Sequence, residues 1–98
     1  MATRWERVAD LRRRVVEGPG RLDPAVRRAA FTGDPVPEPV AAFVDKVRHH
    51  AYKVTDTDVE MLHRAGFGDD EVFELTVSTA LGAGLSRLDR ARAVLDGS

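Results

Sequence analysis

The sequence contains no cysteine, and this absence excludes more chemistry than any other feature of its 98 residues. Without a thiolate there is no disulfide, no thiol nucleophile, no iron–sulfur cluster and no cysteine-ligated zinc. No apolar run approaches the roughly 18 residues of a membrane-spanning helix. The N-terminus also lacks the apolar segment of a secretory signal. We therefore expect a cytoplasmic protein with no membrane contact.

An excess of basic charge is missing as well. Fifteen basic and sixteen acidic side chains give a net charge of −1, whereas nucleic-acid-binding domains usually carry many more cations than anions. The arginines at positions 12–14 belong to a helix in which Asp10 precedes Arg14 by one turn, which predicts an ion-paired surface. Residues 62–74 have the outline of a helix-turn-helix, but they would present four acidic side chains to DNA. We therefore expect no nucleic-acid partner.

What the sequence does contain is apolar spacing of the helical kind almost throughout, with no sustained strand-like alternation. Thr3, Asp23 with Pro24, and either Thr55 or Thr57 are placed to begin three helices. The proline-rich stretch at 32–39 is predicted to be a linker. These patterns predict a single all-α domain, an antiparallel bundle of about five to six helices.

The C-terminal third contains the widest apolar band, at positions 72–81, which predicts a centrally placed helix capped by Asp69. Gly82 and Gly84 either break this helix or allow another backbone to approach it closely. A last helix is predicted to begin at Ser86, and whether the two helices are continuous stays open. The residues expected to face the core in this region are Val72, Phe73, Thr76, Val77, Ala80, Leu81, Leu88, Ala91 and Leu95.

Most candidate proton-transfer groups lie near the end of a helix predicted to run from about residue 38 to Tyr52. Asp45 and His49 are one helical turn apart, so the carboxylate can orient the imidazole. His50 points about 100° away from His49 around the helix axis. The alternative is a solvent-facing helix end, where protonated histidine is favourable. No glycine-rich phosphate loop and no set of metal ligands with suitable spacing is present, so we expect neither cofactor nor metal.

The stretch from about Val36 to Leu95 resembles the carboxymuconolactone decarboxylase and alkylhydroperoxidase D (AhpD-like) superfamily. The similarity rests on the apolar helix after the prolines, the Ala-Gly-Phe turn at 65–67 with the acidic helix start behind it, and the small residues at 80–84. The resemblance implies an all-α, AhpD-like fold that assembles as a homo-oligomer. It divides the domain 1–98 into N-terminal helices with the proline linker at 1–35 and a family-like core at 36–98.

The peroxidase branch of that superfamily uses a Cys-x-x-Cys pair followed by a histidine. Alignment on the Ala-Gly-Phe turn places Ala51 and Val54 at the two cysteines and Asp58 at the histidine. A disulfide-cycling peroxidase without a thiolate has no nucleophile. The resemblance therefore does not carry peroxidase activity to this chain.

Two hypotheses about function follow. The first is an oligomeric binding or structural protein without peroxidase chemistry. The second is a cofactor-free acid–base enzyme of the decarboxylase type, in which Asp45 with His49, or His50, acts as the base while Tyr52 or Lys53 orients an anionic substrate. In the second case His49 or His50 should line a concave pocket. The sequence identifies no small-molecule ligand, although both hypotheses allow one.

Overall fold

The computed structural model describes residues 3–97, and within them the regular structure is entirely helical. The all-α prediction is confirmed, and so is the proline-rich linker, which separates the second helix from the third. The elements in chain order are α1 (Arg4–Glu17), α2 (Pro24–Thr32), α3 (Val40–His49), the short 3₁₀ helix η1 (Ala51–Lys53), α4 (Asp56–Arg64) and α5 (Asp69–Gly97).

Local capping sets the starts of three helices: Thr3 and Asp23 cap as predicted, and of the two threonines considered for α4 it is Thr55 that caps. The side chains of Thr3 and Asp23 each accept a hydrogen bond from a backbone N–H two or three residues further on, and Pro24 occupies the first turn of α2. Thr55 and Asp58 form a reciprocal capping box, in which each side chain bonds the backbone N–H of the other residue. These contacts satisfy amide groups that have no partner within the helix.

The last two predicted helices are one continuous helix, α5, of 29 residues. The predicted start at Ser86 is wrong, because this residue lies in the middle of α5, and Asp69 is the first helical residue rather than the cap. Gly82 does not break the helix. A Cβ atom on Gly82 would come within 2.7 Å of the Phe31 carbonyl carbon, so the glycine lets the end of α2 approach α5 closely.

Two further predictions about burial and length are wrong. The third helix ends at His49 instead of Tyr52, and η1 follows it. Six α5 residues that were expected to face the core are exposed, among them Phe73 to 70% and Leu95 to 84%; the others are Val77, Ala80, Leu88 and Ala91. The cause is that α5 is also apolar along a stripe that none of the other helices within residues 3–97 covers.

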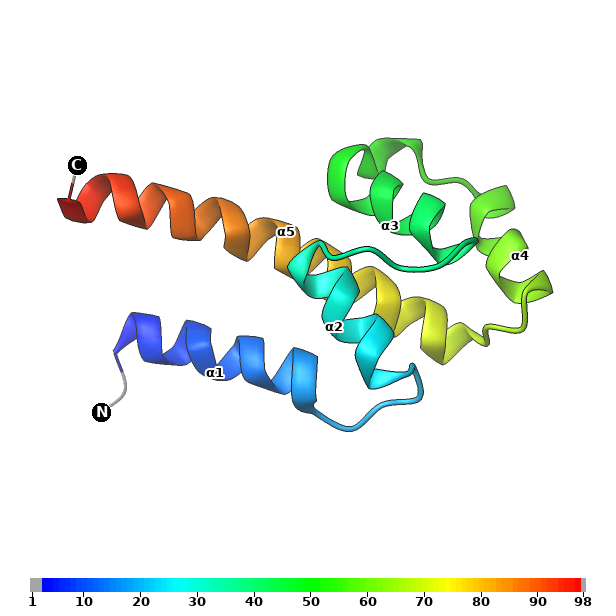
Figure 1. Ribbon diagram of the computed structural model, residues 1–98, viewed down its shortest axis with the longest axis horizontal. Coiled ribbons are helices and arrows are strands. Elements are labelled where there is room, and N and C mark those ends of the chain that lie inside the picture. The colour runs from blue at the N-terminus through cyan, green and yellow to red at the C-terminus, as the bar shows by residue number, and fades with distance from the viewer. Residues whose placement is uncertain (1–2, 98) are drawn as a thin grey trace.

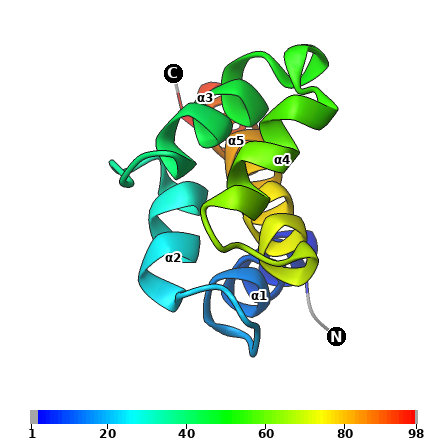
Figure 2. The same cartoon turned by 90° about the vertical axis from the view of Figure 1, so that its right-hand side faces the viewer.

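The core forms where α5 meets the other helices. Figures 1 and 2 show α5 running through the middle of the molecule, with α1 and α2 on one side and α3 and α4 on the other. The central position predicted for this helix is therefore confirmed. Burial of the apolar cluster removes it from water and stabilises the fold. Its buried members are Leu22, Ala30, Val40, Phe43, Val44, Val47, Leu62, Val72 and Leu75.

The C-terminal half of α5 extends beyond α2 and α3, and α1 lies alongside it in the antiparallel direction (Figure 1). None of the α1 residues, all of which the structure describes, is buried. Two polar contacts join the helices: Arg12 pairs with Asp89 at 2.9 Å, and the Arg92 guanidinium lies 4.3 Å from the centre of the Trp5 ring. The result is an elongated molecule measuring 46 × 27 × 20 Å.

Candidate functional site

The predicted proton-transfer residues gather at the C-terminal end of α3 and in η1, but they lie on the surface. His49 Nε2 is 4.0 Å from Asp45 Oδ1, beyond hydrogen-bond distance, and both side chains are more than half exposed. The ring centres of His49 and His50 are 6.5 Å apart, and those of His50 and Tyr52 are 6.2 Å apart. Tyr52 is 81% exposed. Of these four residues, His49 borders a depression.

The three positions that the resemblance aligns with a redox motif have structural contacts here. Ala51 begins η1 and is exposed, whereas Val54 packs against the core. The Asp58 carboxylate accepts hydrogen bonds from Lys46 Nζ at 2.8 and 3.0 Å and from the Thr55 backbone N–H at 2.9 Å. The bond from Lys46, followed by the one from Thr55, holds the pKa of Asp58 below its ordinary value. Asp58 is therefore a paired, capping carboxylate.

The depression beside His49 is rich in arginine. It has a volume of about 180 Å³ and lies between the end of α3 and one side of α5. We call it the arginine pocket; its lining residues are Arg48, His49, Ala83, Ser86, Arg87 and Arg90. Arg48 and Arg87 are 39 positions apart in the sequence, yet Arg87 Nη2 donates to the Arg48 carbonyl at 3.4 Å. The only sequence signal for this site was the helical spacing of Arg87 and Arg90.

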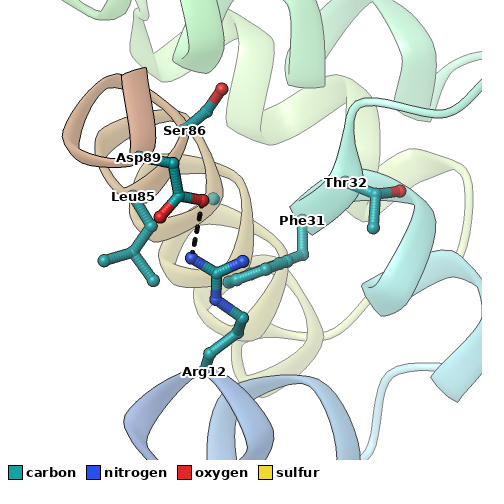
Figure 3. A pocket seen from close by; sticks show the side chains of 7 residues that line it. Arg12, Phe31, Thr32, Leu85, Ser86 and Asp89 are labelled. Atoms are coloured by element: carbon teal, nitrogen blue, oxygen red, sulfur yellow. Dashed lines mark hydrogen bonds and ion pairs between the residues drawn. The ribbon is translucent and has the colours of Figure 1, made fainter. Parts of the chain in front are cut away.

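A second cavity, of about 230 Å³, lies where α1, α2 and α5 meet (Figure 3). The Arg12 side chain reaches across it to Asp89, and its guanidinium carbon lies 5.9 Å from the centre of the Phe31 ring. The charges of Arg12 and Asp89 neutralise each other, and their ion pair joins α1 to α5 across the cavity. It offers a ligand no unpaired charge.

Glu74, which the sequence reasoning did not single out, ties α5 to the loop before α2. Its carboxylate accepts hydrogen bonds from the backbone N–H groups of Arg21, at 2.9 and 3.0 Å, and Leu22, at 2.6 Å. Burial raises the pKa of Glu74, but the bonds from Leu22 and Arg21 and the nearby charge of Arg27 outweigh it, so the pKa lies below its ordinary value. The group stabilises the fold as a carboxylate.

The side of α5 opposite the core carries a stripe of apolar residues with helical spacing. Every residue of this stripe is exposed. We call it the outer face; it consists of Phe73, Val77, Ala80, Gly84, Leu88, Ala91 and Leu95. Small residues alternate with large ones along it, and a Cβ atom on Gly84 would meet nothing within 4 Å. A helix that is apolar on two sides normally has neighbours on both.

Comparison with known proteins identifies no relative of this chain. No protein-family model matches the chain, and neither a curated protein nor a solved structure is significantly similar to it. The resemblance to the AhpD-like superfamily therefore stays a prediction. None of the helices within residues 3–97 is long and apolar enough to cross a membrane. The same residues contain no group of three or more acidic and histidine side chains arranged to hold a metal ion.

Proposed function

We propose that this chain is a cysteine-less member of the AhpD-like superfamily that works as a homo-oligomeric binding or structural protein, without peroxidase chemistry. The observation that carries the proposal is the uncovered outer face of α5. Exposed apolar stripes of this length on a monomer mark interaction surfaces. The occupant we propose is a second copy of the same chain.

The solvent-exposed area of the chain is larger than that of a typical monomer of its mass, which supports a second copy as its partner. The chain exposes 6684 Å², whereas a monomeric protein of 10.8 kDa exposes about 5,500 Å². The excess of about 1,100 Å² exceeds the roughly 800 Å² that each partner buries in a standard interface. The radius of gyration of 14.5 Å is likewise larger than the value of about 12.6 Å for a compact chain of this length. A second copy on the outer face would remove this excess.

The order of residues along the outer face favours an antiparallel pair. If two copies of α5 cross at Gly84, Phe73 of one copy lies opposite Leu95 of the other, and Ala80 lies opposite Leu88. Near the crossing, Ala80 then meets Leu88 and Val77 meets Ala91, so small side chains lie opposite larger ones and the glycines allow the backbones to approach. In a parallel pair, by contrast, each residue would lie opposite its own copy, so the acidic first turns of the two α5 helices would lie together.

The test is the molar mass of the protein in solution, measured by sedimentation equilibrium at micromolar concentration. The wild type should be a dimer or a larger closed oligomer, and Leu88→Glu should be a monomer, because a charge on the outer face would be buried without a partner. Met61→Glu is the matched control, since Met61 is also an exposed apolar residue but lies on α4. A monomeric wild type, or an unchanged mass for Leu88→Glu, would refute the proposal.

A second candidate function is the cofactor-free acid–base enzyme of the decarboxylase type. It is supported by the position of His49, which borders the concave arginine pocket where an anionic substrate could sit. Asp45 lies within one turn of that imidazole, at 4.0 Å. The test is release of carbon dioxide from carboxymuconolactone by the wild type, and its loss in His49→Gln and in His50→Gln. Absence of release by the wild type would eliminate this candidate.

A further inference from the structure

The arginine pocket concentrates positive charge that has no counterion within the chain. Among residues 3–97, no carboxylate lies within 4.0 Å of a guanidinium nitrogen of Arg48, Arg87 or Arg90. By contrast, Arg13 and Arg14 on α1 both pair with Asp10. The net charge of the whole chain is −1, so an excess of basic residues cannot account for the cluster. Three unpaired cations beside one depression repel one another unless an anion joins them.

The pocket is also partly preorganised. Arg48 Nη2 donates hydrogen bonds to the backbone carbonyls of Ala30 and Phe31, both at 2.9 Å, which fixes the guanidinium at the end of α2. Its Nε is buried and has no hydrogen-bond partner among the described residues. Buried N–H groups of this kind are rare in native proteins and call for an acceptor. Arg87 and Arg90 follow on one side of α5, close to the small side chain of Ala83.

The chemistry of these groups identifies the class of ligand. Guanidinium groups match the oxygens of a phosphate with paired hydrogen bonds, and charge-assisted bonds of this type are stronger than neutral ones. Asp45 is the acidic residue next to His49 at this pocket, with its Oδ1 atom 4.0 Å from His49 Nε2. The volume of about 180 Å³ suits a small anion better than a polymer.

We propose that the arginine pocket binds a small phosphate dianion, either free phosphate or the phosphate group of a monoester. The site lies within one chain, so it goes beyond the proposed oligomer and does not require it. Arg87 and Arg90 supply the accessible charges, and Arg48 supplies the fixed one. His49 contributes a ring nitrogen at the rim.

The experiment is isothermal titration of the full chain with inorganic phosphate and, separately, with glycerol 3-phosphate, at pH 7 and low salt. The NMR signals of the His49 ring report where binding occurs. Arg87→Gln and Arg90→Gln should each weaken binding about tenfold, since one charge-assisted hydrogen bond is worth about one factor of ten or more. Arg64→Gln, an exposed arginine on α4, is the matched control and should bind within about twofold of the wild type.

Saturable binding that shifts His49 and is weakened in Arg87→Gln and Arg90→Gln, but not in Arg64→Gln, supports the site. Tighter binding of glycerol 3-phosphate than of inorganic phosphate would then identify a monoester as the source of the group, and the reverse would identify free phosphate. The site is refuted if no saturable binding is seen, or if the control variant loses as much affinity as the pocket variants. The oligomer is tested by mass alone, so the two proposals can fail separately.

Discussion

Replacement of Gly82 by alanine tests the close approach of the end of α2 to α5. Gly82 lies on the buried side of α5, where the backbone of Phe31 at the end of α2 crosses it. A methyl group there would come 2.7 Å from the Phe31 carbonyl carbon and 2.9 Å from its Cα, and closer still to the carbonyl oxygen. Because these are backbone atoms, they can move only if α2 moves with them.

Two opposing effects set the magnitude. Alanine is better than glycine within a helix by about 1 kcal/mol, whereas overpacking of a buried position costs typically about 1–3 kcal/mol and occasionally more. A clash with backbone belongs at the upper end of that range. We expect Gly82→Ala to lower the free energy of unfolding by about 2 kcal/mol, which for a chain of this size lowers Tm by roughly 8–16 °C.

Gly84→Ala is the control, because within the chain its methyl group would meet nothing within 4 Å. Urea unfolding should be followed by circular dichroism at two protein concentrations. The loss in Gly82→Ala should be the same at both, since Phe31 belongs to the same chain. Any loss in Gly84→Ala should shrink on dilution, because it arises only between copies. A Gly82→Ala variant as stable as the wild type would refute the close approach of α2 to α5.

Three further predictions concern the charged and capping groups. Glu74→Gln should lower the free energy of unfolding by about 1–2 kcal/mol at pH 7, because charge-assisted bonds to the loop before α2 are lost in a partly exposed site. The folded-state pKa of Glu74 is depressed, so its contribution is present above the ordinary pKa and is lost as pH falls through the folded value. Thermal melts in acidic buffers should therefore vary less with pH for Glu74→Gln than for the wild type, and equal slopes would contradict the assignment. Asp58→Asn should lower Tm at pH 7 and flatten the same acidic region for the same reason, whereas Lys46→Met should do so only in part, since the bond from Thr55 remains. Thr55→Ala should cost about 1 kcal/mol in urea unfolding through loss of the cap, and no loss would show that the cap is dispensable.

The parts of the fold that could be predicted from the sequence are those that depend on a few neighbouring residues. The caps at Thr3, Asp23 and Thr55 each need only a side-chain oxygen and the next turn of backbone. The prediction that a helix begins at Ser86 was wrong because the course of the chain there depends on a contact with a distant residue. The effect of Gly82 is decided by Phe31, which is fifty-one positions away, and no local pattern contains that contact.

The apolar pattern of α5 also predicted more burial than the chain provides. The spacing of apolar residues shows that a helix has apolar faces. It does not show which of these faces is covered by other helices of the same chain. Leu75 is fully buried and Phe73, two residues earlier, is 70% exposed. Since α5 is apolar on both sides, the choice between them depends on where α2 and α3 pack.

The candidate site likewise has one part that could be predicted from the sequence and one part that could not. The proximity of Asp45 and His49 follows from helical spacing and was predicted, but their separation of 4.0 Å and their exposure depend on the tertiary structure around the end of α3. The arginine pocket was missed because Arg48 comes from α3 and Arg87 from α5. Sites assembled from separate elements require the tertiary structure, and spacing along the chain does not indicate them.

The contacts at positions 51–58 show what the residues that the predicted resemblance aligns with a redox motif do in this fold. Val54 packs against the core, so a thiol there would replace an apolar contact. Asp58 already holds Lys46 and caps α4, and a carboxylate committed to these bonds is not free to relay protons. Two features of the described residues are left without a partner in the chain and carry the proposals instead: the buried Nε of Arg48, which belongs to the arginine pocket, and the exposed apolar stripe on the outer face of α5.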